Sequence, residues 1–246
     1  MPSHQHKAHK RVHEKDCHQG RLDLFTEGRH TPRHLAERLI ACSKLRNTEL
    51  SPLQYRKLYK YSTHPIYRLW DSITDVDDIE VVMAYYHLFN DLFFFHTLAG
   101  RCIIHLVEWD SFSSKAPAKF GYIKTKKRLR NWISREKIPE RMFEIHMHVD
   151  RQEERNRRLL ACIGALLHEM IPGFLYCWAC TDGRCQEELK KQAIFGLPDH
   201  RYLIVDIADA LQNAVQDPEF LGLEALIVNL PDTVAMGAGL SGNNLL

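Results

Sequence analysis

The sequence predicts an α+β fold in which helices pack over a small antiparallel sheet of about three strands. Apolar residues recur at helical spacing in several segments, and three short segments among them have the composition of β-strands. These elements come in the order helix, strands, helix and helix. That order is typical of domains in which the helices are segregated from an antiparallel sheet.

Two short helices are expected ahead of the main domain. Thr31 and Ser51 are each followed by a proline, so each pair combines an N-capping side chain with a residue that favours the first helical position. We expect these two helices to form an N-terminal extension or to pack onto the main domain.

The main domain is expected to contain three further helices, each with apolar residues three or four positions apart. They run from Asp77 or Asp78 to about Leu98, from 153 to about 171, and from Tyr202 to Val215. Gly100 is expected to end the first of them, because glycine readily adopts the left-handed conformation that closes a helix.

Three strands are predicted between the first two of these helices: Arg101 to Trp109, Phe120 to Thr125 and Phe143 to Val149. The third strand has a strict period of two. Its apolar residues fall on one face, and Glu144, His146 and His148 fall on the other.

These elements divide the chain into four parts: a disordered His- and Lys-rich tail (1–30), a helical N-terminal extension (31–74), the main domain (75–215) and a C-terminal tail (216–246). The first part is rich enough in histidine to hold transition metals loosely. The N-terminus lacks the apolar core of a secretory signal, and no apolar run reaches the ~20 residues of a membrane helix. We therefore expect an intracellular protein, nuclear or cytoplasmic, without a membrane partner. Seven cysteines, an odd number, favour reduced thiols or metal ligands over a disulfide framework.

The net charge of +2 says little, but a basic run spans residues 124–137. Such runs are usually solvated faces. The alternative is a surface for DNA, on which lysine and arginine bind phosphates and release counterions. Tyr122 and Trp132 lie near this run and offer rings on which bases can stack.

The segment from Leu166 to Pro172 contains the first half of a zinc-peptidase motif. In His-Glu-x-x-His on a helix, two imidazoles one turn apart bind the same zinc, and the glutamate is the general base for the zinc-bound water. Here His168 and Glu169 are present, and Pro172 stands where the second histidine belongs. Taken alone, the pair also fits a partly buried, hydrogen-bonded histidine without a metal.

Pro172 changes both the ligand set and the expected helix. Proline has no lone pair for a metal, and it lacks the N–H that would bond the carbonyl of His168. Gly173 adds a second helix-weakening residue. We therefore expect the helix to end or bend around Ile171.

The wider sequence resembles the SprT-like family of zinc metallopeptidases. The stretch Leu166-Leu167-His168-Glu169-Met170-Ile171, followed by Phe174-Leu175, is similar to the family's active-site helix. Downstream, Gly196 and His200, followed by Tyr202, match the loop that carries the third zinc ligand.

Weaker similarities extend the resemblance over residues 75 to 215. Phe89 to Phe94 and then Gly100-Arg101-Cys102 resemble the family's first helix and the entry to its first strand, and Gly121-Tyr122 resembles the turn into the next strand. Cysteines after the active-site helix are familiar from fungal members.

The resemblance implies a zincin-like active-site helix and a zinc-dependent endopeptidase; better-known members act on proteins attached to DNA. By position, His168 and His200 would be zinc ligands and Glu169 the general base. Three departures weaken this implication: Pro172 removes a ligand, and Asp199 and Arg201 replace glycines beside His200.

Other residues offer a replacement ligand. His146 and His148 share one face of a strand that we expect near the active-site helix, although an exposed strand face is the simpler interpretation. Cys177, Cys180 and Cys185 form a C-x2-C-x4-C array that could supply one ligand, or a closed structural zinc site with a histidine, or be three free thiols. Glu169 itself could coordinate the metal.

Two functions are therefore expected as alternatives. The first is a SprT-like zinc endopeptidase acting on protein substrates, weakened or inactive because of Pro172. The second is a pseudo-peptidase that binds a protein or DNA without chemistry.

Overall fold

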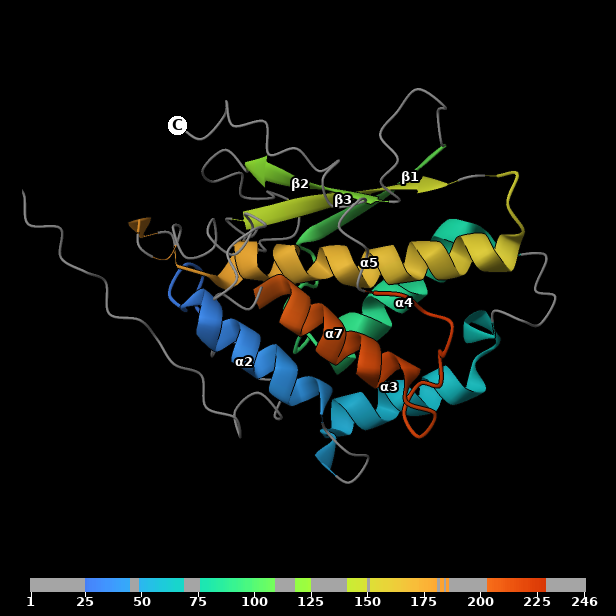
Figure 1. Ribbon diagram of the computed structural model, residues 1–246, viewed down its shortest axis with the longest axis horizontal. Coiled ribbons are helices and arrows are strands. Elements are labelled where there is room, and N and C mark those ends of the chain that lie inside the picture. The colour runs from blue at the N-terminus through green and yellow to red at the C-terminus, as the bar shows by residue number, and fades with distance from the viewer. Residues whose placement is uncertain are drawn as a thin grey trace, which may run out of the picture.

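The computed structural model describes residues 25–44, 49–68, 76–108, 118–124, 141–149, 151–180, 182–183, 185 and 203–228, and it mixes helices and strands in an α+β arrangement. The helices are α2 (Pro32–Ser43), α3 (Pro52–Thr63), the short 3-10 helix η3 (Pro65–Tyr67), α4 (Asp78–Leu92), α5 (Arg155–Trp178) and α7 (Leu203–Gln216). The strands are β1 (Cys102–Glu108), β2 (Ala118–Lys124) and β3 (Arg141–Val149). Figure 1 shows the sheet on one side of the molecule, with α5 directly beneath it and the other helices further below.

The two predicted helix starts near the N-terminus are confirmed. The Thr31 hydroxyl accepts a hydrogen bond from the backbone N–H of His34 and caps α2. Ser51 and Gln54 form a reciprocal capping box at the start of α3. Because these side chains bind backbone N–H groups that lack a helical partner, the local sequence is sufficient to set both starts.

The prediction that the next helix runs to about Leu98 is wrong, because α4 ends at Leu92. Asn90 accepts hydrogen bonds from the turn that follows: its side-chain oxygen binds the N–H of Leu98 and its carbonyl binds the N–H of His96. Phe95 and His96 have positive φ angles of 57° and 60°. These local bonds replace the helical ones and turn the chain into β1.

The sheet has the order β1-β3-β2, with β3 in the centre. β3 pairs antiparallel with β2, but it pairs parallel with β1. The prediction of an antiparallel sheet is therefore wrong for the β1–β3 pair. The alternation of residues identifies the faces of a strand but contains no information on the direction of its neighbour.

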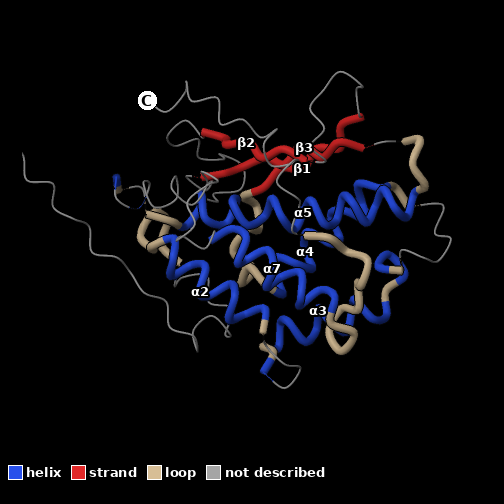
Figure 2. The backbone as a smooth tube through the Cα atoms, in the orientation of Figure 1, coloured by secondary structure: helices blue, strands red, loops and turns tan. Residues whose placement is uncertain are grey.

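The two faces of the sheet differ in burial. On β3, Phe143, Ile145, Met147 and Val149 are buried, whereas the residues between them are partly exposed, as the period of two predicted. All described helices lie on the buried side (Figure 2). The opposite side, here called the outer face, carries Ile103, His105 and Val107 of β1 with Glu144, His146 and His148 of β3.

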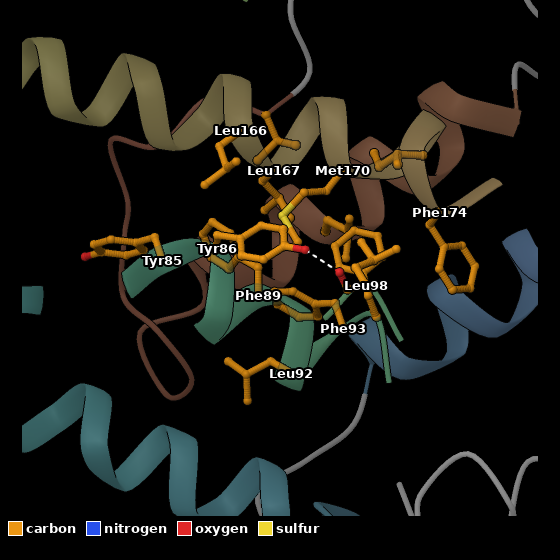
Figure 3. Close-up of a cluster of buried hydrophobic side chains, with 14 of the residues drawn as sticks. Tyr85, Tyr86, Phe89, Leu92, Phe93, Leu98, Leu166, Leu167, Met170 and Phe174 are labelled. Carbon is orange, nitrogen blue, oxygen red and sulfur yellow. Dashed lines mark hydrogen bonds between the residues drawn. The ribbon is translucent and has the colours of Figure 1, made fainter. Parts of the chain in front are cut away.

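α5 is the central element of the core. Its apolar residues pack on α4, where Leu166, Leu167 and Met170 meet Tyr86 and Phe89 (Figure 3). The Tyr86 hydroxyl donates a hydrogen bond to the carbonyl of Leu98 at 2.6 Å, so this buried polar group is satisfied. Among the described helices, α5 alone has the length and hydropathy of a membrane span, and most of it is buried inside this fold, as a core helix also would be.

Segments before and after the main domain join the same core. Leu35 and Leu39 of α2 are fully buried, and α2 lies beside α7 (Figure 1). Beyond α7, Leu226 and Val228 are also fully buried. The segment 223–228, here called the C-terminal strap, contacts α5 at Gly164 and His168 and contacts α7 at Gln212.

Candidate functional site

α5 continues through Pro172 and Gly173 to Trp178. The sequence predicted that the helix would end or bend around Ile171, and the predicted end is wrong. Tertiary packing accounts for this continuation. Ile171 and Phe174 are fully buried on either side of the weak pair. A Cβ atom at Gly173 would lie 2.5 Å from the ring of Phe143, so the glycine lets β3 approach the helix closely.

One stripe of α5 faces the C-terminal strap. Gly164, His168 and Pro172 follow one another at intervals of four residues, which places them on one side of the helix. A Cβ atom at Gly164 would lie 2.2 Å from the carbonyl oxygen of Ile227. The stripe where a peptidase would present two histidines is thus partly covered by backbone.

His168 is held by this strap. Its Nδ1 atom lies 2.9 Å from the carbonyl oxygen of Val228, so Nδ1 carries the proton and donates. Burial lowers the pKa of His168, and the hydrogen bond to Val228 opposes that shift in part. A neutral ring with its proton on Nδ1 leaves the Nε2 lone pair available, as in metal-binding histidines whose other nitrogen binds a carbonyl.

Glu169 lies next to His168 and is also largely buried. Burial raises the pKa of its carboxyl group from 4.5 to about 7. Within the described part of the chain, this carboxyl group has no hydrogen-bond or ion-pair partner. A carboxyl group that titrates near neutral pH suits a general base, because it is partly ionised and still takes up a proton readily.

The donor set around His168 does not complete a zinc site. Pro172 offers no ligand atom at the position one turn along the stripe. His200, with Gly196, Asp199, Arg201 and Tyr202, lies outside the described residues. Catalytic zinc sites use three protein ligands and leave one position for water. The described residues at this site supply one imidazole and one carboxyl group.

The cysteines do not fill the gap. Cys177 lies nine residues after His168 on α5, which is about 13 Å along the axis and on the opposite side of the helix. Burial raises the pKa of its thiol to about 12, against the opposing effect of Arg101. Cys180 and Cys185 are buried beyond the helix end. Within the described part of the chain, these three cysteines do not converge with a histidine into a possible metal site.

His146 and His148 do not approach His168 either. Both lie on the outer face of the sheet, whereas α5 packs on the buried face. Their strand does lie beside α5, as expected, but both side chains are on the face turned away from that helix.

The outer face brings together a group that the sequence did not reveal. His105, Glu144 and His146 form the one set of three or more potential metal ligands that converge among the described residues, with ligand atoms within 4.8 Å of one another. Their only sequence signal was that Glu144 and His146 share the polar face of β3. The addition of His105 depends on the parallel register.

Most of the basic run 124–137, for which a solvated face and a surface for DNA were the alternatives, lies outside the described residues, including Lys126, Lys127, Arg128, Arg130 and Trp132.

No family model, no curated protein and no solved structure matches this chain.

Proposed function

We propose that this chain is a SprT-like metallopeptidase-type domain whose peptidase chemistry is weakened or lost, and that it binds a protein rather than cleaving it efficiently. The sequence resemblance over residues 75 to 215 supports the fold type. The pair His168 and Glu169 on the central helix supports the position of the ancestral site.

One observation carries the loss of activity. Pro172 stands one turn beyond His168 on the same side of an uninterrupted helix, where a peptidase has its second imidazole. A kinked or unwound helix would have allowed a neighbouring residue to swing into that position. Because α5 continues with Ile171 and Phe174 fully buried, the side chain facing the stripe at this point is fixed as proline.

The remaining groups retain features that such a site needs. His168 is oriented by Val228, with its Nε2 lone pair available, and Glu169 can accept a proton near neutral pH. If zinc were bound here with the help of His200, it would polarise a water molecule for attack on a peptide bond. With one ligand fewer, occupancy and activity would both be low.

The test is cleavage of an unfolded protein by the full chain with and without added zinc. We expect little cleavage by the wild type, a zinc-dependent gain in Pro172→His, and loss of that gain when Glu169→Gln is added. Pro52→His is the matched control, because it adds a histidine at an exposed helix start remote from the site.

Two outcomes would contradict the proposal. Zinc-dependent cleavage by the wild type that disappears in Glu169→Gln would show a working peptidase with a substitute ligand. If Pro172→His gains no zinc-dependent cleavage while circular dichroism shows that its helices are intact, the proposal of a SprT-like site on α5 is wrong. Binding of the unfolded protein that is equal in the wild type and Glu169→Gln is the expected sign of a binding module.

A further inference from the structure

The outer face of the sheet carries a second cluster of ligating side chains, separate from the α5 stripe. We propose that His105, Glu144 and His146 bind a divalent transition-metal ion, with zinc as the physiological candidate. This site lies on the face of the sheet opposite α5, and it does not depend on His168, Glu169 or Pro172.

The parallel register builds the cluster. His105 of β1 is directly opposite His146 of β3, and Glu144 precedes His146 by two residues on the same face. The two imidazole rings stack with centroids 4.6 Å apart and an angle of 22° between their planes. Three side chains from two adjacent backbones therefore share one small area of the sheet.

The ligand atoms already lie close to metal-binding positions. Nε2 of His146 is 3.3 Å from one carboxylate oxygen of Glu144, and Nε2 of His105 is 3.8 Å from the other. Ligand atoms at about 2.0–2.1 Å from a tetrahedral zinc ion lie roughly 3.3–3.4 Å from one another. Small side-chain rotations are therefore sufficient to close the set around an ion.

The donor types select the class of ion. Two imidazoles and one carboxylate suit zinc and neighbouring first-row metals, whereas calcium and magnesium prefer all-oxygen sites. The side chains of His105, Glu144 and His146 are 44%, 34% and 37% exposed, so an ion can enter from solvent. Three protein ligands leave at least one coordination position for water or a group from another molecule.

The exposed apolar neighbours favour such an external ligand. Ile103 and Val107 flank His105 on β1, with 42% and 37% of their surfaces exposed. A group from another molecule that fills the open coordination position would form a directional bond to the ion and a small hydrophobic contact with these two side chains.

The competing interpretation is a surface ion pair between Glu144 and the two histidines, without a metal. The test is an equilibrium titration of the full chain with Co²⁺, followed by displacement with Zn²⁺, read by the visible absorption of bound cobalt. The five histidines at 4, 6, 9, 13 and 18 are replaced by glutamine in every sample, to remove loose binding by the N-terminal segment.

We expect one cobalt ion per chain with the intense absorption of a four- or five-coordinate site. His105→Ala and His146→Ala should each weaken binding by more than the roughly 10- to 100-fold that loss of an outer-shell partner causes. Glu144→Gln, which preserves size, should also weaken it. His87→Ala, which replaces an exposed histidine on α4, should leave this affinity unchanged.

Absence of the absorption band at millimolar cobalt would overturn the proposal, as would a band that survives both His105→Ala and His146→Ala. A band lost in His168→Ala instead would assign the metal to the α5 stripe. Because the triad lies on the exposed face, the variants should keep the wild-type circular dichroism spectrum, and a spectrum that collapses in Glu144→Gln would assign the cluster a structural role.

Discussion

The Nδ1 atom of His168 lies 2.9 Å from the carbonyl oxygen of Val228, which is 60 residues further along the chain. Val228 is fixed from its other side, since its N–H donates to the side-chain oxygen of Gln212 on α7 at 2.9 Å. The histidine that resembles a zinc ligand thus also anchors the C-terminal strap to α5.

Replacement of His168 by alanine should lower the free energy of unfolding by about 1–3 kcal/mol, because the buried carbonyl of Val228 loses its donor. Urea denaturation monitored by circular dichroism measures the change. His168→Asn is the matched variant, since an amide N–H can stand close to the position of Nδ1, and it should recover part of the loss. Equal destabilisation by alanine and asparagine would mean that ring packing, rather than the hydrogen bond, holds the strap.

Glu169 should make the stability of the protein depend on pH. Its pKa is raised from 4.5 to about 7 in the folded state, so between these values the folded protein retains a proton that the unfolded chain has released. The contribution of this group to stability is complete below about pH 4.5 and is lost as the pH rises through about 7. Glutamine at this position cannot titrate. The free energy of unfolding of Glu169→Gln, measured relative to that of the wild type, should therefore rise by about 2–3 kcal/mol between pH 4.5 and pH 8.

Urea midpoints of the two proteins at several pH values provide this measurement. The comparison at each pH cancels other titrating groups, including His168, whose lowered pKa has the opposite effect: it reduces stability as the pH falls below 6.5. Stability curves that run parallel for wild type and Glu169→Gln would show that the carboxyl group is not buried in solution.

Pro172→Ala should stabilise the protein by about 1–3 kcal/mol. Alanine restores an N–H for the carbonyl of His168 and removes the clash of the proline ring with the preceding turn. Pro52→Ala serves as the control, because proline at the start of α3 occupies a position without a helical bond to lose and should change stability little. Thermal unfolding of both variants decides the matter, and a destabilised Pro172→Ala would mean that the proline ring makes a packing contribution larger than the missing bond.

Gly164→Ala should lower the free energy of unfolding by about 1–3 kcal/mol, although alanine favours helices. Its Cβ atom would lie 2.2 Å from the carbonyl oxygen of Ile227, and a backbone atom cannot rotate away. Gly183→Ala is the control, because nothing lies within 4 Å of its added carbon. Faster proteolysis after α7 in Gly164→Ala would locate the damage in the strap, whereas wild-type stability would show that the strap moves freely.

Local signals in the sequence were sufficient for the positions of most elements. The capping side chains of Thr31 and Ser51 set two helix starts, and the period of two in β3 identified its buried face. The end of α4 and the passage of α5 through Pro172 were missed for different physical reasons. α4 ends because Asn90 binds the turn that follows it, and the spacing of apolar residues does not reveal such bonds. α5 continues because packing on distant residues such as Phe143 outweighs local propensity.

The candidate site likewise has features that a local motif predicted and features that depend on contacts between distant segments. His168 and Glu169 were found because a motif on one helix is a local feature. The hydrogen bond to Val228, the placement of His146 away from α5 and the inclusion of His105 beside Glu144 required the pairing of distant segments. Strand direction and register depend on that pairing, and no local pattern specifies them.

The central position of β3 matters for a chain that is still being synthesised. In the described sheet, β1 and β2 each pair with β3, and they emerge from the ribosome before it. At ~5–20 residues per second, the interval from the start of β1 to the end of α5 lasts roughly 4–15 s, during which α4 lacks the apolar side chains of α5 that cover it. A chain that stops ahead of β3 is therefore expected to expose this face of α4 and to lack the sheet, rather than to form a smaller folded domain.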